Sequence, residues 1–91
     1  MSQPWYVYLL RCADNSLYCG VTTDLNRRVI EHNQSPTRGA KYTRVRRPVE
    51  LVYSETHASK SLACQREYAI KQLSKSKKEV LVKDQQKNTL V

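Results

Sequence analysis

The pattern of apolar and polar positions divides the first third of the chain into two short strands and one helix. Residues 5–11 are aromatic, β-branched and apolar, a composition typical of a strand. Turn-forming residues at 13–16 separate them from a second short run at 17–21, so we expect a β-hairpin. Gly20 near its end indicates a bulge or a close approach of the backbone to another group.

A helical period follows the hairpin. Residues 22–24 predict a helix start in which a threonine caps the free N–H groups and Asp24 lies at the positive helix end. The helix is expected to end near Asn33. Three apolar positions at helical spacing form its expected buried face: Leu25, Val29 and Ile30. Arg28 and His32 are four residues apart and therefore share another face.

The second half of the chain predicts a charged loop, one strand and two helices. Residues 34–47 contain proline, glycine and five Lys or Arg side chains and indicate a basic loop. Residues 48–55 alternate and predict a strand, whereas residues 59–73 predict a helix. Its expected inward side chains are Leu62, Ala63, Ala69, Ile70 and Leu73. A Ser-Lys-Lys-Glu capping box predicts a short helix over 76–82, and residues 85–91 are expected to form a loose tail.

The predicted order is therefore β-β-α-β-α-α, typical of a small α/β (α+β) layer structure. We expect a three-stranded sheet whose first two strands are antiparallel. A chain of 91 residues has room for one domain, 1–91, with its core over about 5–82.

Charge indicates the class of partner. Sixteen Lys and Arg residues against eight Asp and Glu give a formal net charge of +8, which favours binding to a polyanion. No apolar run approaches the roughly 18 residues of a membrane span, and no basic amphipathic helix is evident. Residues 1–4 lack the features of a signal peptide, so we expect a cytoplasmic protein whose partner is nucleic acid, with no membrane.

The cysteines do not suggest a zinc module. Cys12, Cys19 and Cys64 contain no CxxC pair, and their spacing with His57 fits no common zinc site. We interpret them as buried or half-buried reduced thiols.

Two tyrosines on neighbouring predicted strands are candidates for chemistry. Strand side chains alternate with period two, so Tyr8 and Tyr18 share a face only if the connecting loop has an odd number of residues. An even loop would place them on opposite faces. Both could equally be ordinary core tyrosines.

Two charged helical residues complete the candidate set. Arg28 could lie on a solvated face, as could its neighbour Arg27. Glu67 stands at the margin of the second helix's buried face and could simply pair with Lys71 at i,i+4.

Together these residues supply what phosphodiester cleavage requires. A carboxylate can hold a divalent cation, and a guanidinium can clamp phosphate oxygens. A phenol or an imidazole can take a proton from the attacking water. A phenol needs its pKa lowered for this role, and we expect the basic surroundings to help.

The same residues resemble the motifs of the GIY-YIG nuclease superfamily, and the chain looks most similar to its small stand-alone bacterial members of the YhbQ type. The resemblance covers roughly residues 5–82. The matching elements are Tyr6-Val7-Tyr8, Tyr18-Cys19-Gly20, the arginine helix from Thr22 to Arg28, His32-Asn33, the loop from Gly39 to Thr43, and Arg66-Glu67.

The resemblance implies a three-stranded antiparallel sheet flanked by helices. It also implies an endonuclease that hydrolyses phosphodiester bonds of DNA or RNA, with one Mg²⁺ or Mn²⁺ held by Glu67. Arg28 would stabilise the phosphate, and His32 would relay a proton. Either Tyr8 or Tyr18 would deprotonate the water, while the other supports it. We expect structure selectivity and a role in DNA repair or recombination.

Two departures from the family pattern concern catalysis and substrate choice. The asparagine that several members carry near the C-terminus has no clear counterpart, Asn88 being the nearest residue. We also find no separate DNA-binding domain. Phosphate contacts are therefore expected from six basic residues: Arg27, Arg38, Lys41, Arg44, Arg46 and Arg47. The alternatives are a nucleic-acid-binding module without turnover and an adaptor for an acidic protein.

Overall fold

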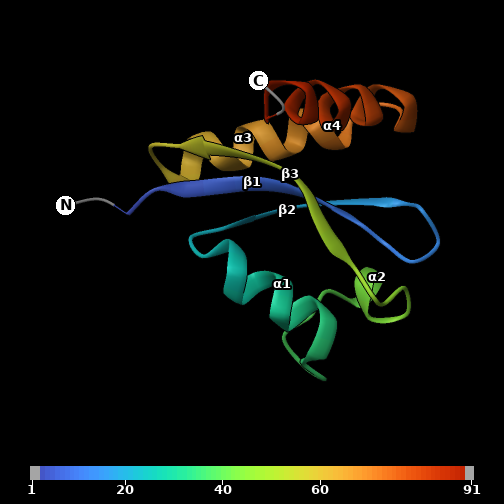
Figure 1. Ribbon diagram of the computed structural model, residues 1–91. Coiled ribbons are helices and arrows are strands. Elements are labelled where there is room, and N and C mark those ends of the chain that lie inside the picture. Colours follow the sequence, from blue (N-terminus) through green and yellow to red (C-terminus); the bar gives the residue numbers. More distant parts are fainter. Residues whose placement is uncertain (1–2, 90–91) are drawn as a thin grey trace.

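A three-stranded antiparallel sheet forms the middle layer of the molecule in a computed structural model that describes residues 3–89 (Figure 1). The strands are β1 (Trp5–Arg11), β2 (Leu17–Thr22) and β3 (Glu50–His57), in the order β2-β1-β3. The helices are α1 (Leu25–Gln34), α2 (Lys41–Arg44), α3 (Lys60–Lys71) and α4 (Lys75–Thr89). The expected fold class and antiparallel sheet are confirmed, and α2 is an added helical turn within the predicted loop.

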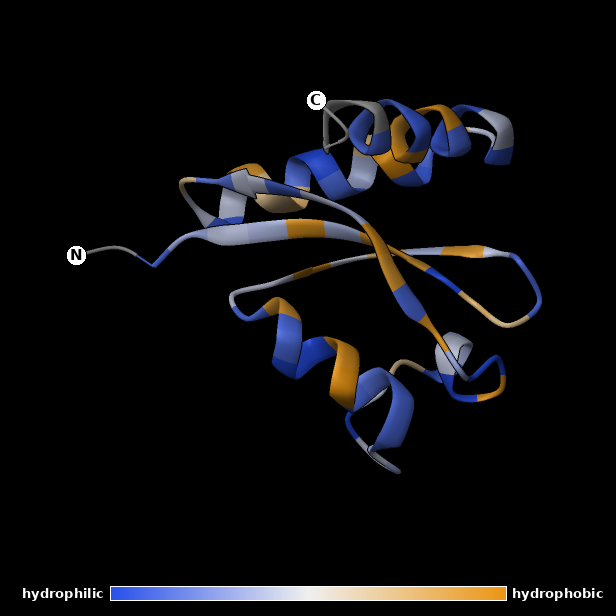
Figure 2. Cartoon of the chain, viewed as in Figure 1, coloured by the Kyte–Doolittle hydropathy of each residue, from blue (hydrophilic) through white to orange (hydrophobic). Residues whose placement is uncertain are grey.

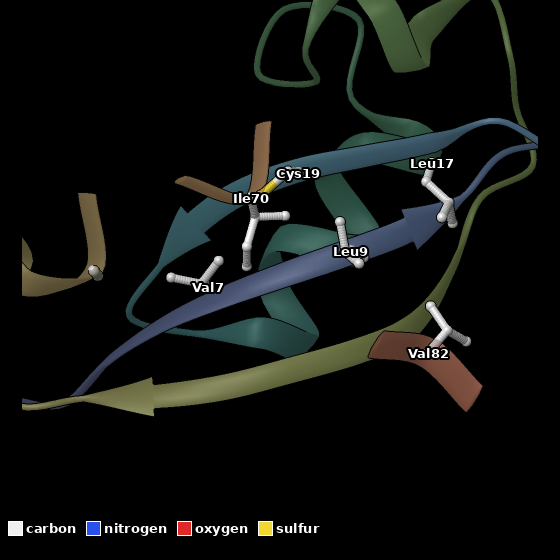
Figure 3. Close-up of a cluster of buried hydrophobic side chains, with 7 residues drawn as sticks. Val7, Leu9, Leu17, Cys19, Ile70 and Val82 are labelled. Atoms are coloured by element: carbon white, nitrogen blue, oxygen red, sulfur yellow. The ribbon is translucent and has the colours of Figure 1, made fainter. Parts of the chain in front are cut away.

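Helices cover both faces of the sheet. In Figure 1, α1 and α2 lie on one side, and α3 and α4 lie on the other. On the α3–α4 side, β1 and β2 pack against both helices (Figure 3). The buried members of that cluster are Val7, Leu9, Leu17, Cys19, Ala63, Ile70 and Val82. Figure 2 shows short hydrophobic bands on α1 and α4, which are otherwise mostly hydrophilic.

The register of β1 against β2 settles which face the tyrosines occupy. Tyr8 lies opposite Gly20, and Leu10 lies opposite Tyr18. Paired residues point to the same side of an antiparallel sheet, so Tyr8 and Tyr18 are diagonal neighbours on the α1 side. Of the two registers that the sequence left open, the structure has the one that brings both rings together.

The start of α1 and its buried face differ from expectation. Asp24 itself is the N-cap, since its side chain accepts a hydrogen bond from the Arg27 N–H, while Thr22 accepts from the Asp24 N–H. The prediction that Ile30 is buried is wrong, because its residue is 55% exposed. His32 is fully buried instead. The face of α1 that carries this imidazole packs toward the sheet, where the polar ring has hydrogen-bond partners on β1 and α2.

Helix α3 also buries fewer apolar side chains than predicted. Ala63 and Ile70 are buried, whereas Leu62 is 48% exposed and Ala69 is also exposed. Ala63 and Ile70 are seven residues, or two helical turns, apart and lie in one line against the sheet. Leu62 and Ala69 lie beside this line and remain in solvent.

The C-terminal helix begins earlier and ends later than predicted. The Ser74 hydroxyl, rather than Ser76, accepts the Lys77 N–H at the start of α4. Glu79 bonds Arg11 and Lys75 and does not complete a capping box. The helix continues to Thr89, so the residues 85–89 that we expected in a loose tail are helical. Residues 90 and 91 lie outside the described part of the chain. Within residues 3–89, no helix combines the length and apolarity needed to cross a membrane.

Candidate active site

A hydrogen bond between a phenol and an imidazole lies at the centre of the α1 side of the sheet. The Tyr8 hydroxyl is 2.8 Å from His32 Nε2, and both residues are buried. Tyr8 belongs to the central strand β1, while His32 lies in the last turn of α1. The other ring nitrogen, Nδ1, is 2.7 Å from the Thr43 hydroxyl on α2. Three elements therefore meet at one imidazole.

Burial moves the pKa values of both central groups away from neutrality. It lowers the pKa of His32 to about 4, with a further lowering by the Arg28 charge, so the imidazole is neutral at pH 7. It raises the pKa of Tyr8 to about 12, because burial outweighs the opposing effect of Arg28. The expectation that basic surroundings would lower the pKa of this phenol is therefore wrong for Tyr8.

Gly20 leaves space for the Tyr8 ring. A Cβ atom at this position would lie 2.6 Å from Tyr8 Cζ and closer still to the hydroxyl oxygen, so any side chain would displace the phenol. The predicted close approach is confirmed, and the group that approaches is Tyr8.

Tyr18 is held by aromatic contacts. Its ring stacks on Tyr42 with centroids 5.8 Å apart and meets the His32 ring edge-on at 5.3 Å. The Arg46 guanidinium lies 3.8 Å from the Tyr42 ring centroid and bonds Asp14 at 3.0 Å. This stack from Arg46 through Tyr42 to Tyr18, which we call the aromatic brace, ties the β1–β2 turn to the site.

The Arg28 guanidinium lies beside the Tyr8 hydroxyl and lowers its pKa through charge and hydrogen bonding. It also donates to Glu31 at 3.0 Å and to the Arg38 carbonyl at 2.6 Å. Its side chain is 25% exposed, so it is oriented by protein groups while still reaching the surface.

Glu67 stands apart from this cluster. It lies on α3, which packs on the opposite face of the sheet from α1, and it pairs with Lys71 at 3.3 Å. The ion pair expected as an alternative role for Glu67 is thus present. Burial raises the pKa of the Cys19 thiol, on the edge strand β2, to about 11, and the negative charge of Glu67 adds to this rise. Tyr8, Tyr18, Arg28 and His32 converge, whereas Glu67 approaches β2 from the other side.

The donor chemistry of Glu67 suits a hard divalent cation bound by a single carboxylate. Mg²⁺ commonly keeps several waters and takes one or two carboxylates together with substrate phosphates. The Glu67 side chain is 22% exposed and has oxygen donors, which fits such a site. Among residues 3–89, no group of three His, Cys, Asp or Glu side chains is clustered for a protein-only metal site.

Known proteins resemble this chain over most of its length. A family model described as the GIY-YIG catalytic domain matches residues 4–80. This chain belongs to the GIY-YIG family. The UPF0213 protein of Desulfotalea psychrophila is 57% identical over 83 residues, which cover 91% of this chain and 74% of that protein. The UPF0213 protein of Natronomonas pharaonis is 56% identical over 85 residues, covering 93% and 98%.

Two solved structures resemble this GIY-YIG domain. The solution NMR structure of the UPF0213 protein from Bacillus halodurans is 48% identical, with a TM-score of 0.56 and coverage of 88% of this chain and 83% of that one. The solution NMR structure of a protein from E. faecalis is 44% identical, with a TM-score of 0.62 and coverage of 91% and 86%. Both support a shared fold with this chain.

The six basic candidates of this GIY-YIG domain fall into two groups. Arg46 is held in the aromatic brace, and Arg47 donates to the His32 and Ser35 carbonyls at 2.6 and 2.5 Å. These two side chains stabilise the loop. The other four residues are exposed: Arg27, Arg38, Lys41 and Arg44.

Three residues that sequence reasoning did not single out shape the GIY-YIG site. Thr43 and Tyr42 contact His32 and Tyr18, as described above. Asn33 bonds both the N–H and the carbonyl of Val49, at 2.7 and 2.9 Å, and joins α1 to the start of β3. All three lie in segments that resemble family motifs. Of the loop, only the basic side chains were predicted to contact the substrate, so Tyr42 and Thr43 were not among the predicted site residues.

Proposed function

We propose that this GIY-YIG domain is a metal-dependent endonuclease that hydrolyses phosphodiester bonds of DNA or RNA and selects its substrate by structure. The observation that carries the proposal is the buried Tyr8–His32 hydrogen bond beside Arg28, in a chain that matches a catalytic-domain family. A domain that only bound nucleic acid would not need a buried phenol coupled to a neutral imidazole.

Tyr8 is the candidate general base. A phenol whose pKa is about 12 is a poor base alone, but the His32 nitrogen at 2.8 Å offers the hydroxyl proton a destination. Tyr8 can therefore accept a proton from water while passing its own proton to His32, without accumulating as a buried phenolate. Tyr18 is more exposed than Tyr8, and we assign it the support of the attacking water.

Arg28 is the candidate phosphate clamp. Its guanidinium is anchored by Glu31 and the Arg38 carbonyl and lies next to the Tyr8 hydroxyl. A positive charge held there stabilises the developing charge on the phosphate without rearrangement during the reaction. We assign Glu67 as the ligand of one Mg²⁺ or Mn²⁺ ion, which when bound would polarise the phosphate and stabilise the leaving oxygen. Because β2 is an edge strand and the Glu67 charge acts on Cys19, next to Tyr18, such an ion would bind at this edge, where the two faces of the sheet meet.

Substrate binding would rest on phosphate contacts. The exposed residues Arg38, Lys41 and Arg44 lie in the loop whose Arg38 carbonyl accepts from Arg28, so we expect their charge to lie near the site. Such binding carries little sequence information and weakens steeply with salt. A structure-selective cut of this kind suits DNA repair or recombination in the cytoplasm.

Cleavage assays test the proposal. Branched, flapped and single-stranded DNA and RNA substrates are incubated with the protein and Mg²⁺ or Mn²⁺. We expect metal-dependent cleavage that falls by about a hundredfold or more in Tyr8→Phe and Glu67→Gln. Tyr68→Phe, at a tyrosine that is 69% exposed, is the matched control and should cut normally. Binding by wild type and Glu67→Gln alike, without cleavage by either, would establish a binding module instead. Nuclease-resistant binding to an acidic protein, without nucleic-acid affinity, would establish an adaptor.

A further inference from the structure

Three side chains and one carbonyl form a continuous hydrogen-bonded series through the site. The Tyr8 hydroxyl lies 2.8 Å from His32 Nε2. His32 Nδ1 lies 2.7 Å from Thr43 Oγ1, and the Thr43 hydroxyl lies 3.0 Å from the Ala40 carbonyl oxygen. Thr43 is fully buried, so no solvent competes for its hydroxyl.

The Ala40 carbonyl gives this series one direction. A carbonyl oxygen only accepts hydrogen bonds, so the Thr43 hydrogen points to Ala40. Thr43 Oγ1 therefore accepts the hydrogen on His32 Nδ1, which leaves Nε2 to accept the Tyr8 hydrogen. In the reverse direction the Thr43 hydrogen would point to Nδ1, and Thr43 Oγ1 and the Ala40 carbonyl oxygen would lie 3.0 Å apart with no hydrogen between them.

We propose that Thr43 is a positioning residue that holds His32 in the Nδ1–H tautomer and thereby makes Nε2 the acceptor of the Tyr8 proton. The inference rests on the proposed function, since it specifies how the base of that reaction works. With its hydrogen directed to Nε2, the Tyr8 oxygen keeps its lone pairs to accept the proton of the attacking water.

The proton transfer balances within these groups. As the water oxygen bonds to phosphorus, the water proton moves to Tyr8 and the Tyr8 proton moves to Nε2. The ester oxygen departs with the electron pair of its bond to phosphorus and takes a proton from solvent. The resulting imidazolium keeps its Nδ1–H bond to Thr43. After product release the proton returns through Tyr8 to solvent, which restores the neutral imidazole.

The segment that leads into α2 and Thr43 packs closely against α1. A Cβ atom on Gly39 would lie 3.0 Å from the Glu31 carbonyl oxygen and 3.1 Å from Arg47 Nη2, so the loop backbone packs tightly against the helix. Arg47 in turn donates to the His32 carbonyl at 2.6 Å. The Thr43 hydroxyl is thus held at a defined distance from the imidazole before substrate binds.

Nitrogen NMR of the histidine ring tests the tautomer directly. The chain has two histidines, and His57→Gln assigns the signals of His32. At pH 7 we expect wild-type His32 to carry its hydrogen on Nδ1. Thr43→Val, which keeps the shape but removes the hydroxyl, should lose this preference, while Thr43→Ser should retain it. A wild-type ring with its hydrogen on Nε2 overturns the inference, and this measurement needs no variant of Thr43.

Cleavage kinetics give the second readout. Thr43→Val should lower kcat by about tenfold to a hundredfold with little change in KM, because the base and not substrate binding is affected. Thr43→Ser should restore kcat, and Thr37→Val, at an exposed threonine in the same loop, should match wild type. An unchanged kcat in Thr43→Val overturns the catalytic part of the inference. If wild type cuts no substrate, the proposed function fails, whereas the NMR result still decides whether Thr43 sets the tautomer.

Discussion

Tyr8 and His32 are 24 residues apart in the chain, and their side chains meet at 2.8 Å between β1 and α1. Each is a polar group in a layer otherwise packed by apolar side chains such as Leu10 and Val49. Buried polar groups are costly unless they are paired. The bond therefore stabilises the α1 side of the fold and also couples a phenol to a proton acceptor.

Gly20→Ala should disrupt the position of Tyr8. The added Cβ would overlap the phenol ring, so the strand or the ring must move. We expect a loss of about 1–3 kcal/mol in the free energy of unfolding, measured by denaturant titration, and a marked fall in cleavage rate. In a Tyr8→Phe background the same change should cost less, because the hydroxyl that approaches closest is gone. Equal costs in both backgrounds would show that Gly20 serves a different contact.

Stability should fall with pH below neutrality because of His32. Its folded pKa, about 4, lies below its ordinary value of 6.5, so the unfolded chain binds more protons between these values. The contribution is fully present above pH 6.5 and is lost as pH falls toward 4, by up to about 3 kcal/mol. Unfolding curves at several pH values measure it. A flat profile from pH 6.5 to 4, or ring NMR that shows His32 protonating near pH 6.5 in the folded protein, would contradict this prediction.

The Arg11–Glu79 ion pair should act in a more acidic window. Two hydrogen bonds of 2.6 and 2.7 Å join α4 to the end of β1, and with Lys75 they lower the pKa of Glu79 to about 2. Its contribution is present above the ordinary pKa and is lost as pH falls from about 4.5 to about 2. Because both side chains are partly exposed, we expect Glu79→Gln to cost about 1 kcal/mol, less at high salt. Asp84→Asn, at an exposed residue of α4, is the control for removing one charge.

We expect the aromatic brace to stabilise the site through the ring of Tyr42 and not through the Tyr42 hydroxyl. Tyr42→Ala removes the surface on which Tyr18 stacks and the ring beneath Arg46, and should cost about 1 kcal/mol of stability together with a loss of turnover. Tyr42→Phe keeps both stacking surfaces and should behave like wild type in unfolding and cleavage assays. A defect in Tyr42→Phe as large as that of Tyr42→Ala would assign the role to the hydroxyl instead.

Local features of the sequence were sufficient for most elements of the fold. The apolar run at β1, the turn residues after it and the alternation at β3 encode strands, since side-chain period and turn chemistry are short-range properties. Gly20 signalled a close approach, and the motif residues pointed to Tyr8, Tyr18, Arg28 and His32 before any geometry was known. Each of these signals depends only on residues that are close to one another in the chain.

Tertiary packing decided which of these groups act together. Whether Ile30 or His32 is the buried residue of α1 depends on hydrogen-bond partners from β1 and α2. The spacing of apolar residues along one helix carries no information about such partners. The shared face of the tyrosines depended on strand register, and the place of Glu67 depended on which side of the sheet α3 covers. Short-range features of the sequence specify the elements and the candidate groups. The hydrogen-bonded series from Tyr8 through His32 and Thr43 to the Ala40 carbonyl exists only in the fold, because it joins β1, α1 and α2.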